Sequence, residues 1–425
     1  MCTSIVRNAG RAAVVGSTDG ASSLQDSGPV GREASVSGVF VMAPTLTAKR
    51  AQEYLSGDYR RIFPNHCPGF IEFDIEAIVM PFSFDELTGR AAGLLSAVGV
   101  PADDARTTAL RLVEADFRGR TGHGLIRLPS YLERLVAGGM KAVPAMRTLH
   151  ETPVSAQVDA DNGLGQVAMT RATELAVAKA RESGVAVVGT VRSNHAGAAG
   201  LYPAMAAEQG LVGVYFAVAN ANGMPPWGGV EPILGTNPVA VAIPTADGAP
   251  FLLDIATTTA SHGTIKVARQ AGEQMPVGWV VGADGEPITD PSRADEGFLV
   301  PIGGYKGAGL TIAIGLLAGV LNGAAFGRSV VDHRVDLTTP TNTGQLVIAF
   351  RADLFRPLEV VLADLTQHLA ELRSSTSRDG GPLRLPGDEA ARRLAQNLRT
   401  GVDPAPAVLA GLDGWAERLG TQRWT

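Results

Sequence analysis

The chain of 425 residues has a formal net charge of −6, with 45% hydrophobic and 18% charged residues. Its length suits two domains, and its apolar content excludes wholesale disorder. The acidic balance and the lack of a basic stripe with interleaved aromatics argue against nucleic acid as a partner.

The N-terminal segment, residues 1–79, differs from the rest of the chain. It is rich in Gly, Ser, Ala and Arg up to about Ser37 and shows no sustained period. We interpret it as an extension that is either poorly ordered or a wrongly assigned start, with Met80 as the natural first residue. Its cysteines, Cys2 and Cys67, fit a reducing compartment and offer no metal-ligand spacing. Because no signal-peptide pattern opens the chain, we expect a cytoplasmic protein.

The next segment, residues 80–145, predicts a helical domain. Residues 85–98 carry apolar side chains at helical spacing, and Pro101 with the acids that follow it is typical of a second helix start. The C-terminal segment, residues 351–425, is also mostly helical, and we expect it to pack with this domain. Its predicted helices are Leu358–Leu372, Glu389–Arg399 and Ala405–Leu419.

The middle segment, residues 146–350, alternates strand and helix patterns, which predicts an α/β sheet layer with helices packed on it. The strand candidates are Val185–Val191, Leu211–Ala219, Val239–Ile243, Phe251–Asp254 and Val277–Val281, and the helix candidates are Val167–Arg181, Ala196–Glu208 and Lys306–Asn322. The apolar stretch 310–326 contains several glycines and falls short of the roughly 20 residues of a spanning helix. We therefore expect a buried helix and no membrane partner.

His195 follows the predicted strand 185–191 directly. Loops at the carboxyl ends of strands are where α/β proteins place ligands, and the small residues after His195 leave room for one. Imidazole suits acid–base transfer near neutral pH, so His195 is the candidate catalytic residue. The alternative is a histidine that only bonds a loop carbonyl.

A second candidate group lies in the segment 122–131. The spacing of four between His123, Arg127 and Tyr131 places them on one face if the segment is helical, although Pro129 argues against a regular helix at its end. The guanidinium of an arginine matches a carboxylate in two hydrogen bonds. The three side chains would make a pocket for a small anionic substrate, or else a surface cation beside a half-buried tyrosine.

A third candidate is Gly303-Gly304-Tyr305-Lys306-Gly307, which opens a predicted helix. Glycines, a helix N-terminus and a lysine together suit a pyrophosphate, although a tight packing turn would have the same sequence. Neither a Walker loop nor a Rossmann GxGxxG fingerprint is present. Two further segments carry polar groups: a turn with Asn237 flanks a predicted strand, and Asp254-Ile255-Ala256 ends another.

Taken in order, these motifs resemble the malate/L-lactate dehydrogenase family that is unrelated to the Rossmann lactate dehydrogenases. The resemblance spans about residues 82–419 and is carried by five motifs together: His-Gly-x-x-Arg-x-x-x-Tyr, Asn-His-x-Gly, Gly-Thr-Asn-Pro, Asp-x-Ala-Thr and Gly-Gly-x-Lys-Gly. The family includes ureidoglycolate, sulfolactate and 2,3-diketogulonate oxidoreductases and reductases of cyclic imino acids.

The resemblance implies a homodimer that binds NAD or NADP in a non-Rossmann, mixed-sheet α/β domain beside a mainly helical domain. It implies that His195 is the acid–base residue and that His123, Arg127 and Tyr131 contact a small carboxylate substrate. Cofactor contacts are implied at Asn237, Asp254, Ile255, Ala256, Gly304, Lys306 and Gly307.

Two positions depart from the family pattern: Gly122 stands where serine is usual, and Ala196 where an aromatic residue is usual. Both departures predict a remodelled substrate pocket, so they put the substrate in doubt more than the reaction.

The expected function is hydride transfer between NAD(P) and a 2-oxo or 2-hydroxy acid. Two alternatives stay open. One is reduction of a cyclic 2-imino acid in biosynthesis, and the other is a catalytically silent relative that acts as a binding protein. No metal site is expected.

Overall fold

The computed structural model describes residues 3–8, 11–16 and 81–425. The chain forms two units, Met1–Pro81 and Phe82–Thr425. In the first unit, β1 (Thr3–Asn8) pairs with β2 (Arg11–Gly16) as an antiparallel hairpin. The hypothesis that Met80 is the natural first residue falls outside the described residues.

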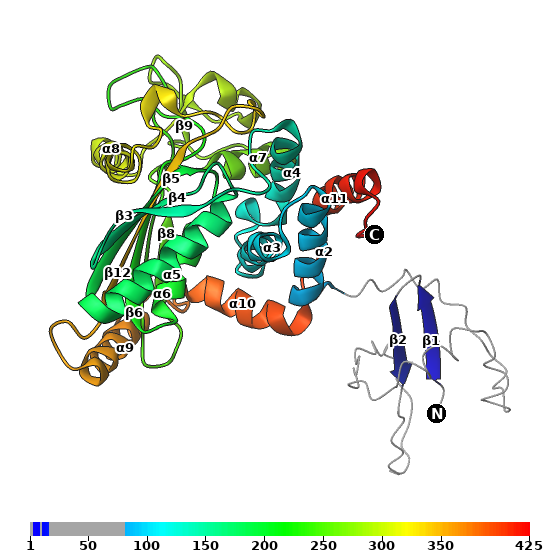
Figure 1. Ribbon diagram of the computed structural model, residues 1–425, viewed down its shortest axis with the longest axis horizontal. Coiled ribbons are helices and arrows are strands. Elements are labelled where there is room, and N and C mark those ends of the chain that lie inside the picture. The colour runs from blue at the N-terminus through cyan, green and yellow to red at the C-terminus, as the bar shows by residue number, and fades with distance from the viewer. Residues whose placement is uncertain (1–2, 9–10, 17–80) are drawn as a thin grey trace, which may run out of the picture. The chain divides into compact units, whose positions relative to one another are not determined.

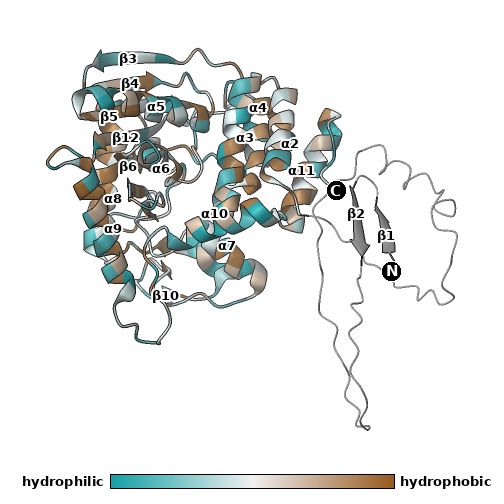
Figure 2. Ribbon diagram, turned by 90° about the horizontal axis from the view of Figure 1, so that it is seen from below, coloured by the Kyte–Doolittle hydropathy of each residue, from teal (hydrophilic) through white to brown (hydrophobic). Residues whose placement is uncertain are grey.

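The helical part of the second unit is built from both ends of that unit, as Figure 1 shows. Its helices are α2 (Phe84–Ala97), α3 (Ala102–Phe117), α4 (Leu128–Ala137), α10 (Asp388–Thr400) and α11 (Pro406–Leu419). Ser83 caps α2 by accepting a hydrogen bond from the amide of Glu86. Apolar residues spaced three and four apart, such as Leu87, Ala91 and Leu94, fill one core, whereas α10 is mostly hydrophilic (Figure 2).

A mixed sheet of seven strands forms the other part, in the order β3-β4-β5-β12-β6-β7-β8. Only β4 and β5 run parallel, and every other neighbouring pair is antiparallel. The strands are β3 (Arg147–Thr152), β4 (Ser155–Asp159), β5 (Val185–Ser193), β6 (Leu211–Ala217), β7 (Val239–Ile243), β8 (Phe251–Ile255) and β12 (Thr343–Arg351). This topology differs from the parallel sheet of a Rossmann domain.

Helices cover both faces of the sheet. The helices α5 (Gly165–Ser183) and α6 (Leu201–Ala207) pack on one face, where Val347 and Ala349 of β12 enter the core. Because strand side chains alternate, Leu346 points to the other face and contacts Ala318 at the end of α8 (Tyr305–Ala318). The protein therefore has a mixed α/β fold with a layered sheet domain and a mainly helical second part.

A smaller lobe lies beyond β8. Its sheet has the order β10-β9-β11, and the helix α7 (His262–Ala271) packs beside it. Its strands are β9 (Val280–Val281), β10 (Pro287–Ile288) and β11 (Phe298–Leu299). The remaining long helix, α9 (Leu358–Ser374), lies beside the large sheet, where the hydroxyl of Thr366 accepts a hydrogen bond from the amide of Ala246 (Figure 1).

Several sequence expectations need correction. The helix predicted from Ala196 begins only at Leu201, because Gly197 takes a positive φ of 79° and the chain runs as a loop to Gly200. The strand predicted at 277–281 shortens to Val280–Val281.

The apolar helix near residue 310 is buried on one side only. The stretch Tyr305–Asn322 is the one described helix that is long and apolar enough to cross a membrane, and 44% of it is buried inside the protein. Large side chains on its other face are exposed: Leu310, Leu316, Leu317, Val320 and Leu321. An apolar face of this size is typical of a contact with another protein surface.

Candidate active site

His195 lies in the loop that joins β5 to α6, so its position depends on how β5 ends. Asn194 is buried at 2% exposure, and its amide donates hydrogen bonds to the carbonyls of Asn162 and Gly163. The Oδ1 of Asn194 accepts a hydrogen bond from the hydroxyl of Thr341. These bonds fix the backbone just before His195.

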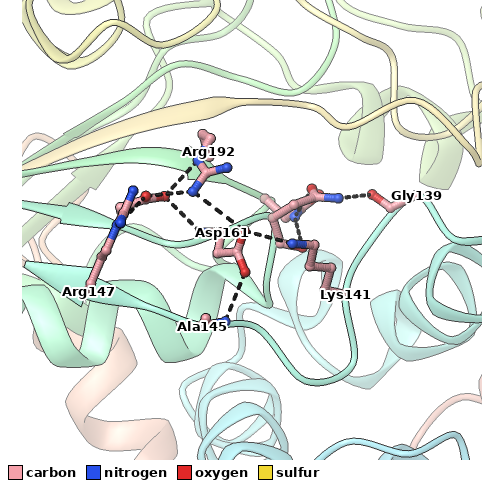
Figure 3. Close-up of polar contacts among 9 residues, drawn as sticks. Gly139, Lys141, Ala145, Arg147, Asp161 and Arg192 are labelled. Carbon is pink, nitrogen blue, oxygen red and sulfur yellow. Dashed lines mark hydrogen bonds and ion pairs between the residues drawn. The ribbon is translucent and has the colours of Figure 1, made fainter.

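An ion-pair network also holds the end of β5 in place (Figure 3). Arg192 has a positive φ of 53°, and its guanidinium donates to both carboxylate oxygens of Asp159 at 2.7 and 2.5 Å. Asp161 accepts from Lys141 Nζ at 2.8 Å and from the amide of Ala145 at 2.9 Å. The network thus joins the end of β5 to the segment that connects the helical part with the sheet.

The imidazole of His195 contacts a buried tyrosine of the helical part. Tyr131 Oη lies 2.6 Å from His195 Nδ1, and Gln166 Nε2 of α5 donates to the same Oη at 2.9 Å. The amide of Gly197 donates to His195 Nδ1 at 3.3 Å. The site therefore lies where the helical part meets the sheet.

Two further imidazoles lie nearly parallel to that of His195. The ring centroids of His123 and His195 are 5.8 Å apart, and those of His195 and His333 are 5.3 Å apart. Burial lowers the pKa of His123 to about 4 and that of His333 to about 4, and it holds the pKa of His195 well below the usual value. The three rings are therefore neutral at physiological pH.

Arg127 is the charged group beside these rings. Its Nε donates to the carbonyl of Gly122 at 2.7 Å, and its pKa is lowered mainly by burial. Among the described residues, no protein acceptor bonds its terminal Nη atoms. A partly buried guanidinium with free Nη atoms can bind a carboxylate in two hydrogen bonds.

The segment that carries these groups is not one helix, which corrects the expectation of a shared helix face. His123 ends a 3₁₀ turn, η2 (Thr121–His123), and Arg127 ends a second one, η3 (Leu125–Arg127). The regular helix α4 begins only at Leu128, with Pro129 in its first turn, where the missing N–H of proline costs nothing. The side chains converge through two tight turns rather than through helical spacing.

A buried acid holds those turns. Asp116 of α3 is 8% exposed and accepts a hydrogen bond from the amide of Leu125 at 2.8 Å. A Cβ atom on Gly124 would lie 2.0 Å from its Oδ1, so only glycine allows this approach. Burial raises the pKa of Asp116 to about 7, although the bond from Leu125 lowers it in part.

This raised pKa predicts a stability that falls as the pH rises. In the unfolded chain Asp116 ionises near pH 3.8, whereas the folded protein keeps the proton up to about pH 7. The free energy of unfolding therefore falls as the pH rises through this window. From pH 5 to pH 8, we expect Asp116→Asn to gain about 2–3 kcal/mol relative to the wild type. Urea unfolding of both proteins at the two pH values measures this difference. A constant difference would contradict the assignment.

The predicted cofactor residues gather around the start of α8. Gly304 has a positive φ of 68° and precedes α8, while Lys306 lies exposed in its first turn. Thr257, which follows the Asp254-Ile255-Ala256 strand end, bonds the hydroxyl of Thr311 in α8 at 2.6 Å. The strand end and the helix start are thus joined directly.

Two of these residues already have contacts within the protein. The amide of Asn237, 1% exposed, donates to the carbonyl of Thr311 and accepts from the amide of Ala219. Asp254 lies 3.9 Å from the Nε of Arg120, which links the strand end to the η2 turn. The structure therefore gives both a positioning role, and their contact with a cofactor stays a prediction.

Two features of the site were missed by sequence reasoning. His333 lies in an irregular segment more than 130 residues from His195, so no local pattern could join them. Beside it, a cavity of about 590 Å³ opens between α7 and the segment that carries Arg334. Basic side chains in its wall are His262, Lys266, Arg269 and Arg334.

Ala196 does not open a pocket. It is 4% exposed and packs in the core between the sheet and α5. The small residue next to His195 is therefore covered by the protein and gives no support to a remodelled substrate pocket, which stays a prediction.

Known proteins are similar to this chain in fold and in sequence. The family model described as malate/L-lactate dehydrogenase matches residues 82–413. The malate dehydrogenase of Pyrococcus abyssi is 34% identical over 350 residues, which cover 80% of this chain and 94% of that protein.

Two solved structures resemble the chain closely. Sulfolactate dehydrogenase from Methanocaldococcus jannaschii superimposes with a TM-score of 0.74 at 34% identity, covering 81% of this chain and 98% of that one. Δ1-Piperideine-2-carboxylate reductase from Pseudomonas syringae pv. tomato gives a TM-score of 0.71 at 30% identity, and the match covers 80% of this chain and 100% of that one. The chain belongs to the malate/L-lactate dehydrogenase family and is a nicotinamide-dependent dehydrogenase.

Proposed function

We propose that the protein interconverts a 2-oxo acid and a 2-hydroxy acid, with His195 as the acid–base residue and Arg127 as the carboxylate-binding residue. One observation carries this proposal: the free Nη atoms of Arg127 and the imidazole of His195 lie in one partly buried site. The charge of Arg127 reaches His195, whose pKa it helps to lower. A substrate carboxylate bound there would offset that charge.

When bound, the nicotinamide cofactor donates a hydride in reduction and accepts one in oxidation. The protein holds the substrate carboxylate on Arg127 and exchanges a proton with the substrate oxygen at His195 Nε2. Among the described residues, no protein group bonds that nitrogen. Positioning and charge stabilisation are expected to supply most of the acceleration.

The start of α8 fits a cofactor phosphate by the chemistry of its donors. The first amides of a helix lack partners within the helix, and this helix has fourteen residues. Lys306 adds a full charge beside them and makes no ion pair with any described residue. We infer that Gly304, Lys306 and Gly307 contact the pyrophosphate and that Asp254, Ile255 and Ala256 lie along the cofactor.

This assignment predicts the effect of removing one charge. Lys306→Ala should weaken cofactor binding by about 10-fold, because a charge-assisted contact to phosphate is lost. Lys306→Arg keeps the charge and should recover most of the affinity. Titration of NADH and NADPH by nicotinamide fluorescence measures both variants. Unchanged affinity in Lys306→Ala would remove the lysine from the cofactor site.

The function is tested by a panel of compounds with each cofactor. Pyruvate, oxaloacetate, glyoxylate and a cyclic imino acid are assayed with NADH and with NADPH, and thermal shifts are recorded in parallel, because bound ligands raise stability. We expect turnover with a 2-oxo acid. Turnover with the cyclic imino acid alone would favour the second candidate, imine reduction, which the likeness to the piperideine-carboxylate reductase supports. Binding of neither cofactor would overturn both.

We also propose that the protein is a cytoplasmic homodimer. The exposed apolar face of α8 and of the 3₁₀ turn after it, which includes Leu317 and Leu321, is the surface that a second copy would cover. Light scattering should give a mass near twice the 44.0 kDa of one chain. Leu321→Glu should shift the protein towards the monomer, since it places a charge in the interface. A wild-type monomer would contradict the dimer, and an unaffected dimer would place its interface elsewhere.

A further inference from the structure

The Nδ1 atom of His195 receives a backbone donor. The amide of Gly197 points at Nδ1 at 3.3 Å, and its position is set by the loop rather than by a rotatable side chain. An amide N–H aimed at Nδ1 is better satisfied by a lone pair than by a second N–H, so we infer that Nδ1 carries no proton in the resting enzyme. The neutral imidazole of His195 therefore has its proton on Nε2.

This assignment fixes the direction of the next two hydrogen bonds. With no proton on Nδ1, the 2.6 Å contact with Tyr131 requires the tyrosine hydroxyl to donate. The Oη atom then accepts the 2.9 Å bond from Gln166, which must present its amide nitrogen. Gln166 thus donates to Tyr131, and Tyr131 donates to Nδ1 of His195. The remaining proton of the imidazole, on Nε2, has no protein partner among the described residues.

We propose that Tyr131 is a positioning and proton-relay residue that supplies a proton to His195 Nδ1 while His195 gives its Nε2 proton to the substrate oxygen. This proposal rests on the proposed role of His195. In reduction, hydride addition at the carbonyl carbon leaves an electron pair on oxygen, and the Nε2 proton bonds to it. The Tyr131 proton moves to Nδ1, so the imidazole stays neutral and a tyrosinate remains. Solvent returns one proton to Nε2 after product leaves, and Nδ1 passes its proton back to Oη.

The surroundings favour this relay over a donor that is already an imidazolium. The groups facing His195 are His123 from η2, Arg127 from η3 and His333. Burial lowers the pKa of His195 most, and each of these groups lowers it further. A charged imidazolium beside a buried arginine is costly. A neutral donor avoids that cost.

The tyrosine end of the relay has compensating contacts. Burial raises the pKa of Tyr131 to about 12, whereas Arg127 and the bond from Gln166 act in the opposite direction. Arg127 and the Gln166 amide would stabilise a tyrosinate for the same reason. The alkoxide of a 2-hydroxy acid is more basic than a tyrosinate, so the proton moves in the direction that reduction needs.

The first test reads the tautomer directly and needs no substrate. Two-bond ¹⁵N–¹H NMR spectra of protein labelled at histidine report which nitrogen carries the proton, and His195→Gln identifies the signal. We expect a proton on Nε2 and none on Nδ1 at pH 7. A proton on Nδ1 in the wild type overturns the proposal, and this arm stands even if a tyrosine variant fails to fold.

The second test uses the pH profile of reduction, with pyruvate, oxaloacetate and glyoxylate as probes. The wild type should keep a constant kcat/KM between pH 6 and 9, since its donor is neutral. Tyr131→Phe should lose about 10–100-fold at pH 8 and regain activity as the pH falls towards 5, because only an imidazolium can then donate. Tyr215→Phe, a buried tyrosine whose ring packs on Tyr202, is the matched control and should keep the wild-type profile.

The outcomes separate this relay from the function on which it rests. A Tyr131→Phe variant that is slower but keeps the wild-type profile overturns the relay and leaves His195 as the acid–base residue. If His195→Ala keeps full turnover, the proposed role of His195 itself fails.

Discussion

Replacing His195 by alanine is expected to lower turnover by about 10²–10⁴-fold, the usual weight of general acid–base catalysis. The variant removes the proposed proton donor, the Nε2 of His195, which no group among the described residues bonds. Cofactor affinity should be nearly unchanged, because the start of α8 is built from other residues. Steady-state rates and a fluorescence titration with NADH and NADPH measure the two effects separately.

The control for this variant is His368→Ala. That histidine lies on α9 with its side chain 69% exposed and pairs only with Glu371. Its loss should leave turnover and folding unchanged. Thermal unfolding must also show that His195→Ala is folded, since Tyr131 and Gly197 lose a partner in it. Turnover within about threefold of the wild type would falsify the role of His195.

Much of the catalytic segment could be predicted because its signals are local. The β-branched run before His195 marks β5, whereas the loop after it was predicted as the start of a helix. The start of α8 could be predicted in the same way, from two glycines followed by a continuous apolar helix. In both cases the signal for the element lies in residues that are adjacent in the sequence.

The centre of the sheet could not be predicted in this way. The strand β12 pairs with β5 and β6 and is the middle strand of seven, yet it lies 150 residues from β5 in the chain. Strands β3 and β4 were also missed, because β3 is an exposed edge strand with polar residues. Pairing over such distances is decided by packing across the whole domain rather than by local pattern.

The contacts around His195 were missed for the same reason. The spacing of His123, Arg127 and Tyr131 predicted one helix face, whereas the structure brings them together through two 3₁₀ turns held by Asp116. Sequence reasoning assigned Tyr131 to the substrate, which stays a prediction, and it did not foresee the contact of the Tyr131 hydroxyl with His195. The motifs could identify the residues of the site, but which side chains contact one another depends on the fold.

Replacing Arg127 by methionine is expected to lower kcat/KM for a 2-oxo acid by about 10²–10⁴-fold, mainly through a higher KM. Methionine keeps a long apolar stem but removes the two free donors and the buried charge. The same change should raise the pKa of His195, because Arg127 helps to lower it. Arg127→Lys keeps the charge but lacks the planar guanidinium, so its kcat/KM should lie between those of the wild type and Arg127→Met.

A carboxylate contact predicts more than a loss of rate. The wild type should prefer pyruvate over pyruvamide, whose amide cannot neutralise Arg127, and Arg127→Met should lose that preference. Arg171→Met is the matched control, since that arginine is 49% exposed and pairs with Asp104 on the surface; it should leave the preference intact. If Arg127→Met still discriminates against pyruvamide as strongly as the wild type, the carboxylate binds elsewhere. The basic wall of the cavity beside Arg334 would then be the next site to test.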